Sequence, residues 1–279
     1  MIYNINRRKF IELFSYSCCG LILPSCSTVP ITERRQLSLY PESTINNSAS
    51  KAYQVFKTKN KLVTSGNQLD SVMEIGKRIE FAVSKFFLKK DGKDPTSHFQ
   101  WEYILVDNDK VKNAWCMPGG KIAVYTGILK VTKNDNALAA VMGHEIAHAV
   151  AKHSVERASQ ALTVNLGAQV ADIFLGGAIS RTRNTIGQNS GMDIFQLGIF
   201  NPFGRKQETE ADYLGLIFSS LAGYDIRESV KLWERMAQSN KGKEPPQFMS
   251  THPSSKNRII NLNKWITEVM VSYPPIKRI

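Results

Sequence analysis

The stretch that decides the fold is His144-Glu145-Ile146-Ala147-His148, which lies inside an apolar, alanine-rich run. The run predicts a helix, and side chains four positions apart on a helix project from the same face. His144 and His148 can therefore bind one metal ion together. Glu145, about 100° further round the helix, can reach a metal-bound water without binding the metal. This spacing indicates a zinc hydrolase, although an ordinary helix with two histidines and a solvated glutamate would give the same five letters.

A second stretch, Glu208-Thr209-Glu210-Ala211-Asp212-Tyr213-Leu214-Gly215, predicts another helix whose small residues allow close approach to the first. Glu208 and Asp212 share one face of that helix. A catalytic zinc ion takes three protein ligands and keeps a fourth position open for water. We therefore expect one Zn2+ per chain, with His144, His148 and Glu208 as its ligands.

The neighbours of these residues have expected roles of their own. Asp212 is suited to accept the free ring N–H of a ligand histidine and so fix its tautomer. Glu210 points about 200° away from the expected third ligand, so we expect it to be solvent-facing or structural. A metzincin would need a histidine where this chain has Ser154. His153 would lie on the far side of a continuous helix from His144, and we expect it to be structural.

The two motifs together resemble the gluzincin peptidases of peptidase family M48. The stretch 113–127, with Asn113-Ala114-Trp115 and Pro118-Gly119-Gly120, is similar to the family's segment ahead of the zinc helix. Ser250-Thr251-His252-Pro253-Ser254, followed by Arg258, is similar to its C-terminal signature. The resemblance implies an α+β, mostly helical zincin-like metallopeptidase domain with a small β-sheet, acting on polypeptide substrates. Glu145 would then be the catalytic base.

Two features of the expected active site remain open. His252 could be catalytic by stabilising the oxyanion, could occupy the open zinc position as a latch, or could make a structural hydrogen bond. The resemblance to zincins makes Lys121–Thr126 the candidate edge strand to which a substrate backbone would add. A paired interior strand is the alternative for that segment.

The amino terminus has the layout of a bacterial lipoprotein signal. A basic start, Asn6-Arg7-Arg8-Lys9, precedes a mostly apolar run that ends in Leu23-Pro24-Ser25-Cys26. This predicts lipid on Cys26, with the protein anchored in the cell envelope and facing the periplasm. An uncleaved signal anchor is the competing interpretation, but Glu12 interrupts the apolar run.

Composition fits one globular domain, because 42% of the 279 residues are hydrophobic and 22% are charged. We expect a signal at 1–25, a polar tether at 26–66 and the metallopeptidase domain at 67–279. Its expected helices are 67–90, 134 to beyond 153, 208–223, 226–239 and 256–271, and its expected strands are 99–106 and 121–129.

The net charge of +12 is spread over the chain rather than gathered beside aromatic residues, so no nucleic-acid partner is expected. Such a charge would suit an anionic membrane surface or simply solubility. Cys116 is expected to be a small buried hydrophobe. The segment 161–191 is expected to form either an amphipathic helix or a cover over the zinc cleft, or to contact the membrane.

The combined expectation is a lipid-anchored zinc metalloendopeptidase that removes misfolded or misassembled envelope proteins, a biological role implied by the family alone. Two alternatives stay open: a latent zinc-bearing chaperone or assembly factor, and a mitochondrial inner-membrane metalloprotease. The catalytic motifs fit the mitochondrial alternative, but the lipobox-like stretch does not. The oligomeric state is left open.

Overall fold

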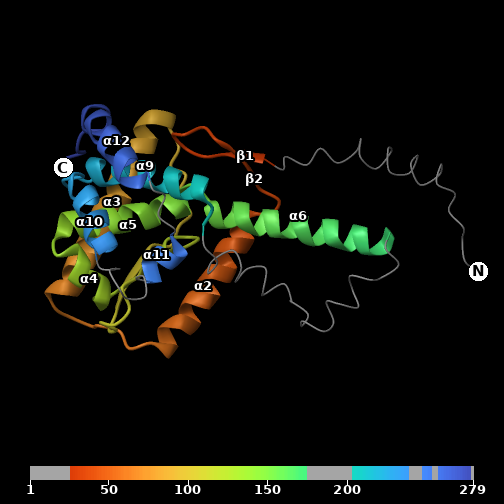
Figure 1. Cartoon of the computed structure of the whole chain (residues 1–279), viewed down its shortest axis with the longest axis horizontal. Helices are drawn as coiled ribbons and strands as arrows, with labels where there is room; N and C mark the ends of the chain where they lie inside the picture. The colour runs from red at the N-terminus through yellow and green to blue at the C-terminus, as the bar shows by residue number, and fades with distance from the viewer. Residues whose placement is uncertain (1–25, 175–202, 239–246, 253–256, 278–279) are drawn as a thin grey trace, which may run out of the picture.

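The computed structural model describes residues 26–174, 203–238, 247–252 and 257–277 (Figure 1). The expected lipoprotein signal at 1–25 lies outside these residues, as does the 175–191 part of the expected cover. Among the helices that are described, none has both the length and the apolar character needed to cross a membrane.

A three-stranded sheet lies at the centre of the α+β fold. Its order is β3 (Glu102–Val106), β5 (Lys121–Tyr125) and β4 (Ala114–Met117), with β3 parallel and β4 antiparallel to β5. Lys121–Thr126, the candidate edge strand, is therefore the paired interior strand, and β4 is an edge instead. The expected strand over 121–129 also ends early, because α4 (Thr126–Thr132) begins directly after Tyr125.

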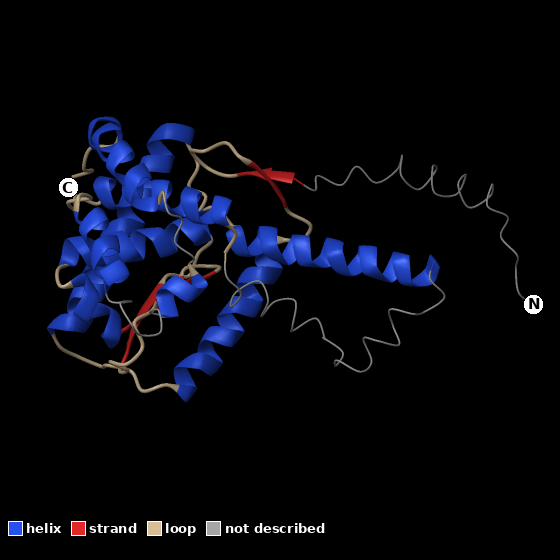
Figure 2. Ribbon diagram, viewed as in Figure 1, coloured by secondary structure: helices blue, strands red, loops and turns tan. Residues whose placement is uncertain are grey.

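Both faces of this sheet are covered by helices (Figure 2). Strand side chains alternate between the two faces. Ala123 belongs to the apolar cluster that includes residues of α2 (Glu42–Lys59), whereas its neighbours on β5 join the larger cluster formed with α3 (Asn67–Asp91) and α5 (Asp135–Val150). The sheet thus lies between α2 on one side and the helix that carries the histidines on the other.

The segment expected to be a polar tether is folded for most of its length. β1 (Cys26–Thr28) pairs with β2 (Arg35–Leu37) as an antiparallel hairpin, and α2 follows it. Tyr53 of α2 is fully buried against the sheet. The prediction of a tether failed because α2 buries only one residue in every four. The polar residues between these buried positions obscure the helical periodicity in the sequence.

The helix that carries the histidines starts as predicted and ends earlier than predicted. The side chain of Asn134 accepts a hydrogen bond from the backbone N–H of Ala137, which is an N-cap interaction. The helix ends at Val150, and Lys152 has the positive φ of 58°. A new helix, α6 (His153–Phe174), begins after Ala151 and Lys152. The expectation of one continuous helix past His153 was wrong.

The rest of this part of the fold is helical. α9 (Arg205–Leu221) lies along α5, α10 (Glu228–Gln238) also packs against α5, and α12 (Arg258–Ser272) packs against α9 and α10. The short helix α11 (Gln247–Thr251) directly precedes His252. The backbones of α5 and α9 meet at Gly143 and Gly215, where a Cβ on Gly215 would lie 2.8 Å from the backbone nitrogen of His144. This contact is the close approach that small residues on both helices predicted.

Candidate metal centre

Four buried side chains from three parts of the chain converge beside α5. His144 and His148 come from α5, Glu208 from the first turns of α9, and His252 directly follows α11. Each offers one ligand atom, and these atoms all lie within 4.8 Å of one another. His144 Nε2 lies 3.1 Å from His148 Nε2 and 3.6 Å from a carboxylate oxygen of Glu208. Sequence reasoning expected the first three as ligands and left His252 open.

Aromatic rings enclose this cluster. Phe203 stacks on the ring of His148 with 3.8 Å between centroids, and Phe248 stacks on His252 at 4.7 Å. The four clustered side chains are at most 4% exposed. Such a water-poor environment strengthens electrostatic interactions between the groups inside it.

The protonation states of His148 and Glu208 suit a divalent cation, which binds neutral imidazoles and ionised carboxylates. Burial lowers the pKa of His148 well below its usual value, which keeps the ring neutral. Burial acts to raise the pKa of Glu208, but the imidazole rings of His148 and His252 that face it outweigh this effect and hold that pKa below its ordinary value. Glu208 is therefore ionised across the physiological range.

Glu145 faces the same cluster from its own turn of α5. Its carboxylate is buried, and its Oε1 lies 3.3 Å from Nε2 of His252. That oxygen has no hydrogen-bond partner of good geometry among the residues described. Burial, only partly offset by His252 and His144, raises the pKa of Glu145. A carboxylate with a raised pKa and a free acceptor oxygen is suited to exchange a proton with a water held at the cluster.

The Asp212 carboxylate lies beside the ring of His144, with 3.0 Å between Oδ1 and Nδ1. Arg258 of α12 holds the Asp212 carboxylate through its Nε at 2.6 Å and reaches Glu208 through another guanidinium nitrogen, also at 2.6 Å. The guanidinium lies over the ring of Trp233, 3.9 Å from its centroid. Sequence reasoning placed Arg258 in a motif and gave it no role; here it joins the expected ligand Glu208 to the expected partner of His144.

Of two further residues near the cluster, sequence reasoning placed His153 wrongly and offered two alternatives for Glu210. His153 was expected on the far side of the helix, but its Nδ1 lies 2.8 Å from Nδ1 of His148. Glu210 is not solvent-facing, because it is 7% exposed and its Oε2 lies 2.9 Å from Nε2 of His153. The structural alternative given for Glu210 agrees with this geometry. The position of His153 depends on the helix break at Lys152, and nothing in the local sequence marks that break.

The strand β4 also borders the cluster. Cys116 packs, partly buried, against the main apolar cluster of the core. Burial raises the pKa of its thiol well above the ordinary value, so the residue is uncharged, in keeping with the hydrophobic role expected for it. The backbone of Cys116 also interacts with the Glu145 carboxylate and favours its charged form. An edge strand of the sheet thus borders the cluster at Glu145.

The fold and this cluster define a class of protein, the metallopeptidases with an H-E-x-x-H helix and a third acidic ligand on a second helix. The chain belongs to peptidase family M48, whose sequence profile matches residues 77–266. The match covers α5, α9 and His252, and so includes every residue for which the sequence predicted a role in the centre.

Named relatives come from mitochondria and from bacteria. The chain is 39% identical over 179 residues to mitochondrial metalloendopeptidase OMA1 of Schizosaccharomyces pombe, covering 63% of this chain and 49% of the relative. It is 31% identical over 189 residues to mitochondrial metalloendopeptidase OMA1 of Homo sapiens, covering 64% of this chain and 36% of that protein. A putative beta-barrel assembly-enhancing protease of Vibrio cholerae is 29% identical over 174 residues, covering 61% of this chain and 34% of the relative. The chain thus spans half or less of the length of these relatives.

Proposed function

We propose that this protein is a zinc-dependent metalloendopeptidase. The observation that carries the proposal is the convergence of His144, His148, Glu208 and His252, whose ligand atoms lie within 4.8 Å of one another beside the H-E-x-x-H glutamate. Imidazole and carboxylate donors suit Zn2+, and the donor set of two histidines and one glutamate is that of known catalytic zinc sites. The Oε1 of Glu145, which faces the same cluster and has no hydrogen-bond partner within the described part of the chain, supports the fit.

In this proposal His144, His148 and Glu208 hold the ion, and Asp212 fixes the ring of His144. Bound zinc would lower the pKa of a water and polarise the scissile carbonyl. Glu145 accepts the proton that the water loses as its oxygen attacks the carbonyl carbon. Glu145 then delivers that proton to the leaving amine nitrogen as the C–N bond breaks, so the protons balance.

The polypeptide substrate would add to β4 rather than to the strand expected from the sequence. β5 is paired on both sides, whereas β4 lies at the edge of the sheet and borders Glu145 through Cys116. Main-chain pairing along β4 would align an extended segment with the metal and select little by side chain. Segments of unfolded or misassembled proteins are substrates of this kind.

The test is digestion of casein by the purified full chain, with and without a metal chelator, beside the Glu145→Gln variant. We expect cleavage that the chelator abolishes and added zinc restores, and one bound zinc ion in both proteins. Cleavage that survives complete removal of the metal, or full activity of the variant, would overturn the proposed mechanism.

His252 favours a second candidate function, a zinc-bearing chaperone or assembly factor whose peptidase activity is latent. Its Nδ1 lies 3.0 Å from Glu208 and 3.3 Å from His144, close enough to serve as a fourth protein donor. Four protein donors would fill the position that a catalytic site keeps open. The His252→Ala variant separates the roles: increased cleavage supports latency, and decreased cleavage supports oxyanion stabilisation.

The compartment belongs to this proposal as well. The lipobox-like sequence and the exposed position of Cys26 at the start of β1 support a lipid-anchored enzyme of the bacterial envelope that removes misassembled proteins. The names of the mitochondrial relatives support a mitochondrial membrane protease at least as well. Mass spectrometry of the N-terminal peptide of the protein from its native cells separates the two, since only the envelope proposal predicts diacylglycerol on Cys26.

A further inference from the structure

The ring of His148 is held from both sides. Its Nε2 faces the metal donors, 3.1 Å from His144 Nε2 and 3.4 Å from Glu208 Oε1. Its Nδ1 faces the opposite way and meets Nδ1 of His153 at 2.8 Å. The other nitrogen of His153 lies 2.9 Å from the Glu210 carboxylate. The three side chains form a continuous buried chain that starts at the proposed metal position and ends at Glu210.

Hydrogen-bond chemistry fixes the proton on each ring of this chain. An ionised carboxylate only accepts hydrogen bonds, so Nε2 of His153 carries a proton and donates it to Glu210. Nδ1 of a neutral His153 is then an acceptor, and Nδ1 of His148 must carry the proton between the two rings. Nε2 of His148 is left with its lone pair, which faces Glu208 and His144. The row of three hydrogen-bonded side chains thus holds His148 in the one tautomer that can bind a metal through Nε2.

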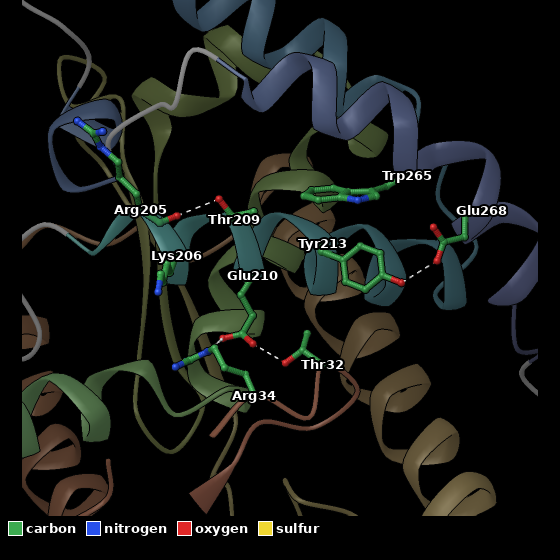
Figure 3. A pocket seen from close by; sticks show the side chains of 9 residues that line it. All are labelled: Thr32, Arg34, Arg205, Lys206, Thr209, Glu210, Tyr213, Trp265 and Glu268. Atoms are coloured by element: carbon green, nitrogen blue, oxygen red, sulfur yellow. Dashed lines mark hydrogen bonds and ion pairs between the residues drawn. The ribbon is translucent and has the colours of Figure 1, made fainter. Parts of the chain in front are cut away.

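Glu210 is itself held by the N-terminal hairpin. Figure 3 shows Thr32 and Arg34 converging on its carboxylate. Arg34 donates from Nε to Glu210 at 2.8 Å, and the hydroxyl of Thr32 donates to the other oxygen. The two terminal nitrogens of Arg34 bond Glu156 of α6 at 2.8 and 2.9 Å, which fixes the guanidinium between two helices. Arg34 precedes the stretch 77–266 that the family profile matches.

We propose that Arg34, Glu210 and His153 form a positioning relay that sets the tautomer and ring orientation of His148, which makes the N-terminal hairpin a working part of the metal centre. The inference rests on the proposed function, because the oriented lone pair on Nε2 of His148 would bind the metal. The two ligand histidines are then supported differently. His144 lies directly beside a carboxylate, Asp212, whereas His148 reaches its carboxylate through a second imidazole.

Zinc affinity tests the relay without relying on catalysis. Chelator competition on the full chain would compare wild type with His153→Gln, Glu210→Gln, Arg34→Met and Arg34→Lys. Loss of a group that orients a metal ligand weakens binding by about 10–100-fold, and we expect this for the first two variants. Arg34→Met should weaken binding less, and Arg34→Lys should restore part of the loss because it returns the charge beside Glu210.

The matched control is Tyr213→Phe. Tyr213 lies on the same helix as Glu210 and lines the same surface pocket in Figure 3, but its hydroxyl bonds Glu268 at 3.0 Å and does not contact the relay. Its zinc affinity should equal that of wild type. Thermal unfolding of every metal-free variant identifies those that fail to fold.

A measurement on the unmutated protein keeps the relay testable if the buried variants do not fold. Ring 15N NMR should find His148 protonated at Nδ1 and His153 protonated at Nε2. Protonation of His148 at Nε2 in the metal-free protein, or unchanged zinc affinity in folded His153→Gln, would overturn the relay. Wild type that binds no zinc while both rings show the expected tautomers would overturn the proposed function and leave the relay geometry intact.

Discussion

Replacing Gly215 with alanine should separate the two helices that carry the metal donors. A Cβ at this position would lie 2.8 Å from the backbone nitrogen of His144 and 2.9 Å from its Cα. Relaxed contacts between carbon atoms need about 3.5–4.0 Å, so α5 and α9 must move apart by roughly 1 Å. All three nearest atoms belong to the backbone of α5, so no side-chain rotation can relieve the clash.

Two opposing effects set the size of the change. Alanine favours a helix over glycine by about 1 kcal/mol. Overpacking a close-packed contact costs about 1–3 kcal/mol, and the backbone position of this clash puts the cost toward the upper end. We therefore expect a net loss of stability of about 1–2 kcal/mol. Because metal sites tolerate distance errors of only about 0.2 Å, moving Glu208 away from His144 and His148 should weaken zinc binding by at least about tenfold.

Urea unfolding of the metal-free protein and chelator competition measure the two effects. Gly204→Ala is the matched control, because Gly204 precedes the same helix and the nearest atom to its added Cβ is 3.9 Å away. That control should lose no more than about 1 kcal/mol, as expected for an N-cap change, and should keep its zinc affinity. Gly215→Ala with unchanged zinc affinity would refute the idea that this contact sets the separation of the donors.

Three other perturbations have defined outcomes. Glu145→Gln should lose cleavage in a peptide assay while elemental analysis still finds one zinc ion, because the residue moves protons and does not bind the metal. Arg258→Met should lower the unfolding free energy of the metal-free protein by about 3–5 kcal/mol, since it leaves two buried carboxylates without their cation; a loss below 1 kcal/mol in urea titration would contradict this. The third concerns Glu210, whose pKa burial acts to raise but hydrogen bonds from His153 and Thr32 hold below its ordinary value. The ionised Glu210 therefore stabilises the fold fully above about pH 5, and this stabilisation declines as the pH falls through the lower pKa of the folded state. The stability difference between wild type and Glu210→Gln should therefore be flat near neutrality and shrink on acidification, and growth of that difference at low pH would show the opposite linkage.

The innermost part of the centre followed from spacing. Helix geometry alone placed His144 and His148 together, and the small residues of the second motif indicated that another helix would approach them. The structure brings Glu145, Glu208, Asp212 and His252 to the same place. Spacing could not reveal the outer part. Arg258 reaches Asp212 from a separate helix, and such a contact depends on tertiary packing that no local pattern encodes.

The errors came from three places where local patterns mislead. A helix pattern continues through His153, because the break depends on one residue, Lys152, adopting a positive φ that non-glycine residues seldom adopt. The interior position of β5 depends on pairing between strands distant in the sequence, and an apolar strand looks alike at the centre and at the edge of a sheet. α2 was missed because its apolar positions are few and widely spaced.

The arginine at position 34 links hairpin and ion thermodynamically. Coupling between two binding events is reciprocal, so whatever factor the docked hairpin adds to zinc affinity, bound zinc must add to the docking equilibrium of the hairpin. Removing the ion would then loosen the hairpin at 26–37, far along the sequence from any ligand. Occupancy of the metal would in this way be sensed at the end of the protein where Cys26 lies.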